Sequence, residues 1–102
     1  MSESQKPHST GISSEKKQIY LGRRQVDLIS LRSSLSTKNF GEIYTIAHKI
    51  KGNSRLFDFS ELEPIALELE TAAKSENEIL TQTAISKFEQ ILLSLENNER
   101  AI

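Results

Sequence analysis

A histidine, a lysine and a glycine at helical spacing form the part of this chain best suited to chemistry. His48 is followed by Lys51 three residues on and by Gly52 four residues on. In a helix, residues three and four apart lie side by side on one face. The lysine would therefore lie next to the imidazole, and the glycine would leave one approach to it open. Such a site could hold an anionic group on a ring nitrogen.

Phosphoryl transfer is a chemistry that these three residues could perform. A neutral imidazole is a good nucleophile near pH 7, because its unperturbed pKa is about 6.5. It can take a phosphoryl group on one ring nitrogen and pass it on, because the P–N bond is labile. The site needs an exposed nitrogen, an open approach and a nearby cation, for which His48, Gly52 and Lys51 are the candidates.

Each candidate also has an ordinary interpretation. A histidine or a lysine on a helix flank is commonly a solvated surface residue, and a glycine can mark a kink or an early helix end. A glycine inside a helix costs about 1 kcal/mol relative to alanine, which favours a steric reason for Gly52. Tyr44, Arg55 and Leu56 are candidates for a docking surface around the histidine, although Tyr44 and Leu56 also fit packing at the edge of a core.

Four segments show apolar residues at helical spacing, and no segment alternates as a strand would. We predict helices over residues 19–36, 39–57, 60–74 and 78–97. Short connections favour antiparallel neighbours, so the predicted fold is all-α, an up-down-up-down four-helix bundle. Residues 1–18 are predicted to be a disordered tail and residues 98–102 a frayed end, which leaves residues 19–97 as the bundle.

The second segment places His48 away from the core. Its buried face is predicted from apolar and small residues at steps of four and three, namely Ile43, Ala47, Ile50, Ser54 and Phe57. At about 100° per residue, His48, Lys51 and Gly52 fall on a flank turned away from that face. We therefore expect an exposed imidazole.

The other segments have comparable patterns. In the first, Val26 and Ile29 are predicted to widen a leucine stripe, with Arg24 and other charged residues solvated. The third is predicted to begin with a capping box of Ser60 and Glu63. The predicted buried face of this third segment consists of Leu62, Ile65, Ala66, Leu69, Ala72 and Ala73. The predicted buried face of the fourth segment consists of Ala84, Phe88, Ile91, Leu92 and Leu95. Ser75 or Asn77 is the expected cap of the fourth segment.

Composition excludes several classes of function. The chain has 102 residues, a net charge of −1 and no cysteine, so nothing in it favours nucleic-acid binding, disulfides or a thiolate site. No apolar run approaches the length of a membrane span, and no signal-peptide core is present. We expect a cytoplasmic monomer without nucleic-acid or membrane partners.

Enzyme interpretations find little support. His8 lies in the polar tail, so only His48 remains for a metal site, and we predict none. The chain has no glycine-rich phosphate loop, no nucleophile elbow and no paired Glu-x-x-His elements. Four acidic residues of the third segment are interpreted as a solvated face: Glu61, Glu63, Glu68 and Glu70.

Residues 47–52 (AHKIKG) resemble the His-x-x-Lys-Gly motif of histidine phosphotransfer (HPt) domains. Residues 31–35 (LRSSL) and 67–73 (LELETAA) resemble flanking parts of the same family, so the resemblance covers about residues 20–96. One departure is the sequence FDF at 57–59, where many members have glycine after the histidine helix. Asp58 can still adopt the left-handed conformation there, at some cost.

The resemblance implies a phosphorelay carrier. His48 would accept and donate the phosphoryl group, Lys51 would compensate its charge, and Gly52 would keep the histidine accessible. The partners would be the aspartate of a response-regulator receiver domain and a histidine kinase, including hybrid kinases. The receiver would bring Mg²⁺, and the chain would need no cofactor or kinase site of its own. The alternative is a four-helix adaptor that binds a receiver or kinase without phosphotransfer.

Overall fold

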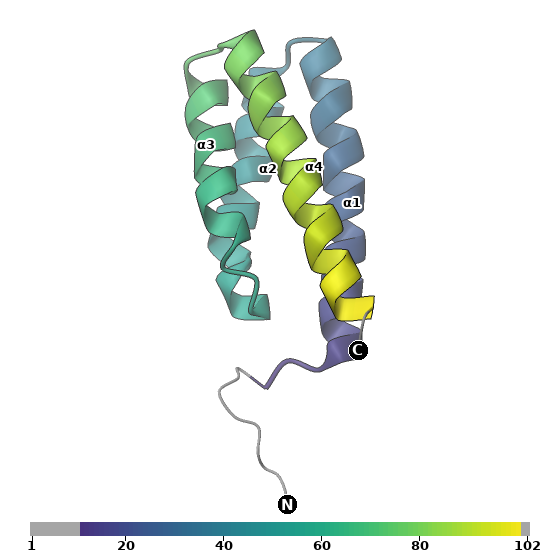
Figure 1. Cartoon of the computed structure of the whole chain (residues 1–102). Helices are drawn as coiled ribbons and strands as arrows, with labels where there is room; N and C mark the ends of the chain where they lie inside the picture. The colour runs from purple at the N-terminus through teal and green to yellow at the C-terminus, as the bar shows by residue number, and fades with distance from the viewer. Residues whose placement is uncertain (1–10, 101–102) are drawn as a thin grey trace, which may run out of the picture.

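Four helices and one short 3₁₀ turn make up the computed structural model, which describes residues 11–100. The elements in chain order are α1 (Ser14–Ser36), α2 (Phe40–Asn53), η2 (Arg55–Phe57), α3 (Leu62–Lys74) and α4 (Glu78–Arg100). Helices α1 and α3 each pack against both α2 and α4, and all four run side by side along one axis (Figure 1). The predicted all-α four-helix bundle is confirmed.

Side-chain caps fix where three of the helices begin. Ser13, Asn39 and Asn77 accept hydrogen bonds from backbone N–H groups three residues on, at 3.1, 3.1 and 2.9 Å. These bonds satisfy N–H groups that have no partner within the helix. The predicted start of the second helix at residue 39 is confirmed to within one residue, and of the two expected caps of α4, Ser75 and Asn77, the structure shows Asn77.

The ends of the helical region differ from the prediction. Because Ser13 caps α1, the helix begins at Ser14, and residues 14–18 belong to it rather than to a tail. Helix α4 continues to Arg100, so residues 98–100 are helical where fraying was predicted. The remaining parts of the two predicted flexible ends, residues 1–10 and 101–102, lie outside the described residues.

The connection between α2 and α3 is longer than predicted and contains a short 3₁₀ turn. Helix α2 ends at Asn53, and η2 carries the chain to Asp58, whose φ of 68° and ψ of 32° are left-handed. The predicted capping box is wrong: α3 begins one residue after Glu61, which makes no side-chain cap, and the Glu63 N–H donates to the Ser60 carbonyl instead. The left-handed Asp58 agrees with the conformation expected of it.

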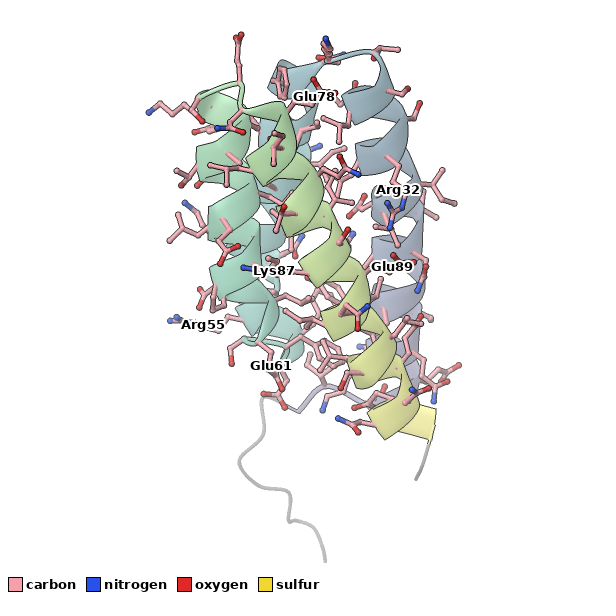
Figure 2. All side chains as sticks on the ribbon, turned by 45° about the horizontal axis from the view of Figure 1, so that its top comes forward. Arg32, Arg55, Glu61, Glu78, Lys87 and Glu89 are labelled. Atoms are coloured by element: carbon pink, nitrogen blue, oxygen red, sulfur yellow. The ribbon has the colours of Figure 1, made fainter. Side chains whose placement is uncertain are left out.

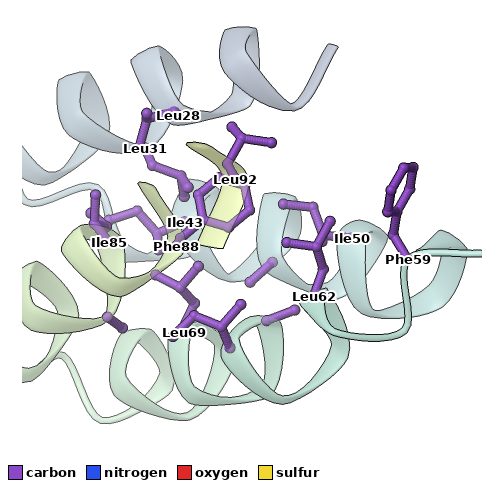
Figure 3. Packing of buried hydrophobic residues seen from close by; sticks show 14 of the residues in the cluster. Leu28, Leu31, Ile43, Ile50, Phe59, Leu62, Leu69, Ile85, Phe88 and Leu92 are labelled. Atoms are coloured by element: carbon purple, nitrogen blue, oxygen red, sulfur yellow. The ribbon is translucent and has the colours of Figure 1, made fainter. Parts of the chain in front are cut away.

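All four helices contribute to the core, α1 with Leu28 and Leu31 among others, and the predicted faces of α2, α3 and α4 form the rest (Figure 3). From the face predicted for the second segment it includes Ile43, Ala47 and Ile50 of α2 and Ser54 directly after it, all at most 1% exposed, whereas Phe57 of η2 is only partly buried. From α3 and α4 it includes every residue predicted for their buried faces, Ile91 being only partly covered. These contacts fix the rotation of α2 and therefore the direction in which His48 points.

Two predictions about residues of helix α1 are wrong. Val26 and Ile29 are 61% and 68% exposed, because at about 100° per residue they fall nearly opposite the buried Leu28 and Leu31. Arg24, predicted to be solvated, has a side chain only 11% exposed. Its guanidinium lies 4.4 Å from the centre of the Tyr20 ring, an arrangement in which the cation faces the aromatic system.

Candidate functional site

His48 projects from α2 beside α3, and its side chain is 62% exposed. Ile43, Ala47 and Ile50 are buried on the opposite side of the helix, so the imidazole is directed out of the core as predicted. Its Nδ1 atom lies 2.6 Å from Oε2 of Glu70 on α3. One ring nitrogen is therefore engaged by the neighbouring helix, while most of the ring remains accessible to a partner.

Glu70 joins the histidine to the lysine. Its side chain is only 9% exposed, and its second oxygen, Oε1, accepts a hydrogen bond from Lys51 Nζ at 2.7 Å. The interpretation of Glu70 as part of a solvated face is wrong. It is the residue of the candidate site that sequence reasoning missed. The side chains of Glu63 and Glu68 on the same helix are more exposed, at 30% and 52%.

The charge state of this cluster follows from its contacts. The hydrogen bond from Lys51, and then that from His48, lower the pKa of Glu70 below its usual value. The same bond to Glu70 raises the pKa of Lys51. At neutral pH the carboxyl is therefore ionised and the ammonium is protonated.

An ionised Glu70 fixes the proton on the imidazole. A carboxylate has only acceptor atoms, so a hydrogen bond between it and a neutral imidazole requires the proton on Nδ1. The tautomer is thus inferred from the contact partner. The lone pair of a neutral ring then lies on Nε2, the nitrogen for which no hydrogen bond is recorded within residues 11–99. The cluster presents a nucleophilic nitrogen to solvent.

Of the three residues predicted for a docking surface, only Tyr44 lies directly beside His48. The Tyr44 ring stacks beside the imidazole, with ring centres 5.9 Å apart and planes 9° from parallel. Arg55 points instead to the start of α3, where it donates to Glu63 at 2.8 Å (Figure 2). Leu56 is 66% exposed in η2, eight residues along the chain from His48. Tyr44 therefore adjoins the site directly, whereas Arg55 and Leu56 lie beyond it.

Gly52 lies in the last turn of α2, where a Cβ atom added to it would meet nothing within 4 Å. The helix ends one residue later, so the glycine is both open to solvent and close to a helix end. The structure therefore agrees both with a steric role for Gly52 and with its being a mark of the helix end. The steric role stays a prediction.

Among residues 11–99, no group of three His, Cys, Asp or Glu side chains is placed to hold a metal ion. No helix in this region is both long and apolar enough to cross a membrane.

The family model of the Hpt domain matches residues 17–98, which is nearly the whole chain, and this chain belongs to the Hpt domain family. Hpt domains are phosphotransfer carriers that act in phosphorelays with receiver and kinase domains, and they have no kinase site of their own. No curated protein and no solved structure gave a significant match. The resemblance in the sequence and the four-helix fold agree with this membership.

Proposed function

We propose that this chain is a histidine-containing phosphotransfer protein that accepts a phosphoryl group on Nε2 of His48 and exchanges it with the aspartate of a receiver domain. The observation that carries the proposal is the contact of Glu70 with Nδ1, at 2.6 Å, on a side chain that is 62% exposed. This contact holds the ring in place and leaves the other nitrogen to react.

The proposed phosphoryl transfer needs no general base. The Nε2 lone pair attacks the phosphorus of an aspartyl phosphate, the P–N bond forms as the P–O bond breaks, and the aspartate leaves as a carboxylate. No proton has to be removed, because the reacting nitrogen carries none. The ring becomes positive as the bond forms, and the buried carboxylate of Glu70 on the Nδ1 side stabilises that charge.

The neighbouring residues have supporting roles in this proposal. Lys51, 35% exposed and bonded to Glu70, supplies positive charge beside the incoming phosphoryl oxygens. Gly52 leaves the approach free, since no side chain covers that part of the helix. Tyr44 forms the nearer part of a docking surface, with Arg55 and Leu56 at its margin. Mg²⁺ would come with the receiver, and the cytoplasmic location and monomeric state stay predictions.

Phosphate transfer from a labelled receiver tests the proposal. After incubation with a phosphorylated receiver domain, the chain should carry acid-labile, alkali-stable phosphate. His48→Gln should abolish the label without changing helicity or melting, because the side chain is largely exposed. The matched control is His8→Gln, which removes the only other histidine and should keep the label.

Two results would redirect the assignment. Label on the His48→Gln variant would show that another residue is the acceptor. Binding of receivers or kinases with no label on the wild type, from any donor tried, would favour the adaptor function.

A glycine substitution tests steric access. Gly52→Leu should slow transfer from the receiver, while Gly22→Leu, on an equally open glycine of α1, should leave the transfer rate unchanged. Both variants should fold, because neither side chain meets an obstacle in the described structure. Equal transfer rates in the two variants would contradict the role proposed for Gly52.

A further inference from the structure

Helix α1 carries a second apolar stripe on the side facing away from the bundle. We call it the outer stripe; it consists of Ile19, Gly22, Val26 and Ile29, at steps of three, four and three residues. The three large side chains are 54%, 61% and 68% exposed. Scattered surface hydrophobics need no explanation, but this spacing is that of a helix seam.

The residue types of the outer stripe suit contact with another helix better than they suit solvent. Valine and isoleucine are weaker helix formers than the polar residues commonly found on exposed faces. Gly22 also costs helix stability, and a Cβ atom added there would meet nothing within 4 Å. The backbone at Gly22 is therefore open to close approach by a partner.

A basic hollow lies along the edge of the outer stripe that faces α2. It has a volume of about 290 Å³ and is lined by Lys16, Ile19, Tyr20, Arg23, Arg24, Asn53 and Phe57. Three of these are cations and none is an acid. Ile19 belongs both to the hollow and to the outer stripe, so the two features form one continuous surface.

The unused polar groups of the basic hollow are hydrogen-bond donors. Tyr20 donates its hydroxyl to Oδ1 of Asn53 at 2.5 Å, which leaves the Asn53 amide nitrogen available. Arg24 is held at 2.7 Å from Asp27, and neither Lys16 nor Arg23 has an ion pair recorded with residues 11–99. A carboxylate entering the hollow would therefore meet the donors of Lys16, Arg23 and Asn53, while Asp27 engages Arg24 alone.

We propose that the outer stripe and the basic hollow together dock an amphipathic helix of a partner protein whose flank is acidic. The apolar face of that helix would cover Val26 and Ile29, and its carboxylates would enter the hollow beside Arg23. This surface is separate from His48, which lies between α2 and α3.

A second copy of the chain fits this surface less well. On the opposite flank of the outer stripe, α1 carries Gln18, Gln25 and Arg32. Gln25 and Arg32 already bond to glutamates of α4. These contacts already engage the two glutamates on that flank, Glu89 and Glu96, so charge complementarity favours a different helix with free carboxylates.

A designed peptide tests the docking surface. The probe is a labelled helix of about three heptads with leucine at the seam positions and glutamate on both flanks, whose like charges oppose its own pairing. Fluorescence anisotropy should show binding to the full chain, weakened at least about tenfold by Val26→Asp. Leu93→Asp is the matched control, since Leu93 is 48% exposed on α4 and should have no effect.

Charge is tested separately. Arg23→Glu should weaken binding of the glutamate-flanked peptide more at low salt than at high salt, because salt screens exposed charges. Lys87→Glu changes the same charge on the opposite side of the bundle and should leave binding unchanged. A lysine-flanked peptide with the same seam should bind more weakly than the glutamate-flanked one.

Three outcomes would overturn this proposal. They are equal binding by the wild type and the Val26→Asp variant, equal binding of the two peptides, and a homodimer in light scattering that Val26→Asp dissociates. Thermal melting controls for folding, and Val26→Asp should melt like the wild type because its side chain is exposed. Labelling of His48 should be normal in this variant, so failure here is distinguishable from failure of the proposed phosphotransfer.

Discussion

Glu68 and Glu70 lie two residues apart on α3, yet they have different surroundings. Glu68 is about half exposed and reaches Lys87 of α4 at 3.3 Å (Figure 2). Glu70 is 9% exposed and bonds two groups of α2, His48 and Lys51, at 2.6 and 2.7 Å. Two residues turn a helix by about 200°, which sends the two side chains to opposite neighbours.

The comparison shows that an acid–base contact between helices gains importance from burial and from the number of partners. An exposed pair is weakened by water and salt and contributes about 0–1 kcal/mol at most. The carboxylate of Glu70 is enclosed, so losing it would leave two oriented groups without their partner. The following variants test how far the two glutamates differ.

The largest effect is expected for Glu70→Ala. Removing this carboxylate frees the imidazole to rotate and to change tautomer, so the rate of phosphoryl transfer to His48 should fall about tenfold or more. The free energy of unfolding should drop by about 1–3 kcal/mol, because hydrogen bonds to a charged group are lost. Rates of labelling and chemical denaturation measure the two effects. Normal labelling by a folded Glu70→Ala protein would contradict the orienting role.

A smaller effect is expected for Lys51→Ala. This variant keeps the contact of Glu70 with His48 and removes only the cation, so transfer should slow by about three- to tenfold. Lys87→Ala removes a lysine from the other glutamate and is the control, with an unchanged rate expected. A loss of rate equal to that of Glu70→Ala would show that the lysine, rather than the carboxylate, orients the ring.

Lowering the pH should change the free energy of unfolding through Glu70 more than through Glu68. Because the folded-state pKa of Glu70 is lowered, its contribution is present above the unfolded pKa of about 4.3 and is lost as pH falls through the folded value. The stability advantage of the wild type over Glu70→Gln should therefore shrink below about pH 4.3. Denaturation at a series of pH values measures it, and an advantage that is constant with pH would refute the assignment of an ionised Glu70.

The smallest effect is expected for Glu68→Ala. Its pair with Lys87 is exposed, so the free energy of unfolding should change by no more than about 0.5 kcal/mol. The rate of transfer to His48 should stay at the wild-type value. A loss approaching that of Glu70→Ala would remove the distinction between the two glutamates.

Sequence periodicity was sufficient for the fold and for the exposure of His48. The buried face of α2 repeats regularly, so the direction of its other side follows from the sequence. For α1 the type of residue misled the prediction, because Val26 and Ile29 are apolar but lie off the buried face. Their spacing relative to Leu28 indicates that they lie away from the buried face.

The contacts of Glu70 with His48 and Lys51 could not be predicted from the periodicity of apolar residues. It lies four residues after Ala66 and three before Ala73, at the edge of the buried face of α3, and this position was a signal that it is not fully solvated. Its partners depend on how α2 and α3 are aligned along their length. That alignment results from core packing and the turn at Asp58, neither of which the spacing of apolar residues defines.

The turns between the helices have a consequence for engineering this scaffold. Lys38, Asp58 and Glu76 have positive φ values of 56°, 68° and 55°, whereas Gly22 stands within a helix. A left-handed conformation costs a residue with a side chain about 1–2 kcal/mol, and a helical glycine costs about 1 kcal/mol. Placing glycine at position 38 or 76 and alanine at position 22 would reverse both penalties. The native chain therefore retains room for thermostabilisation at sites distant from His48.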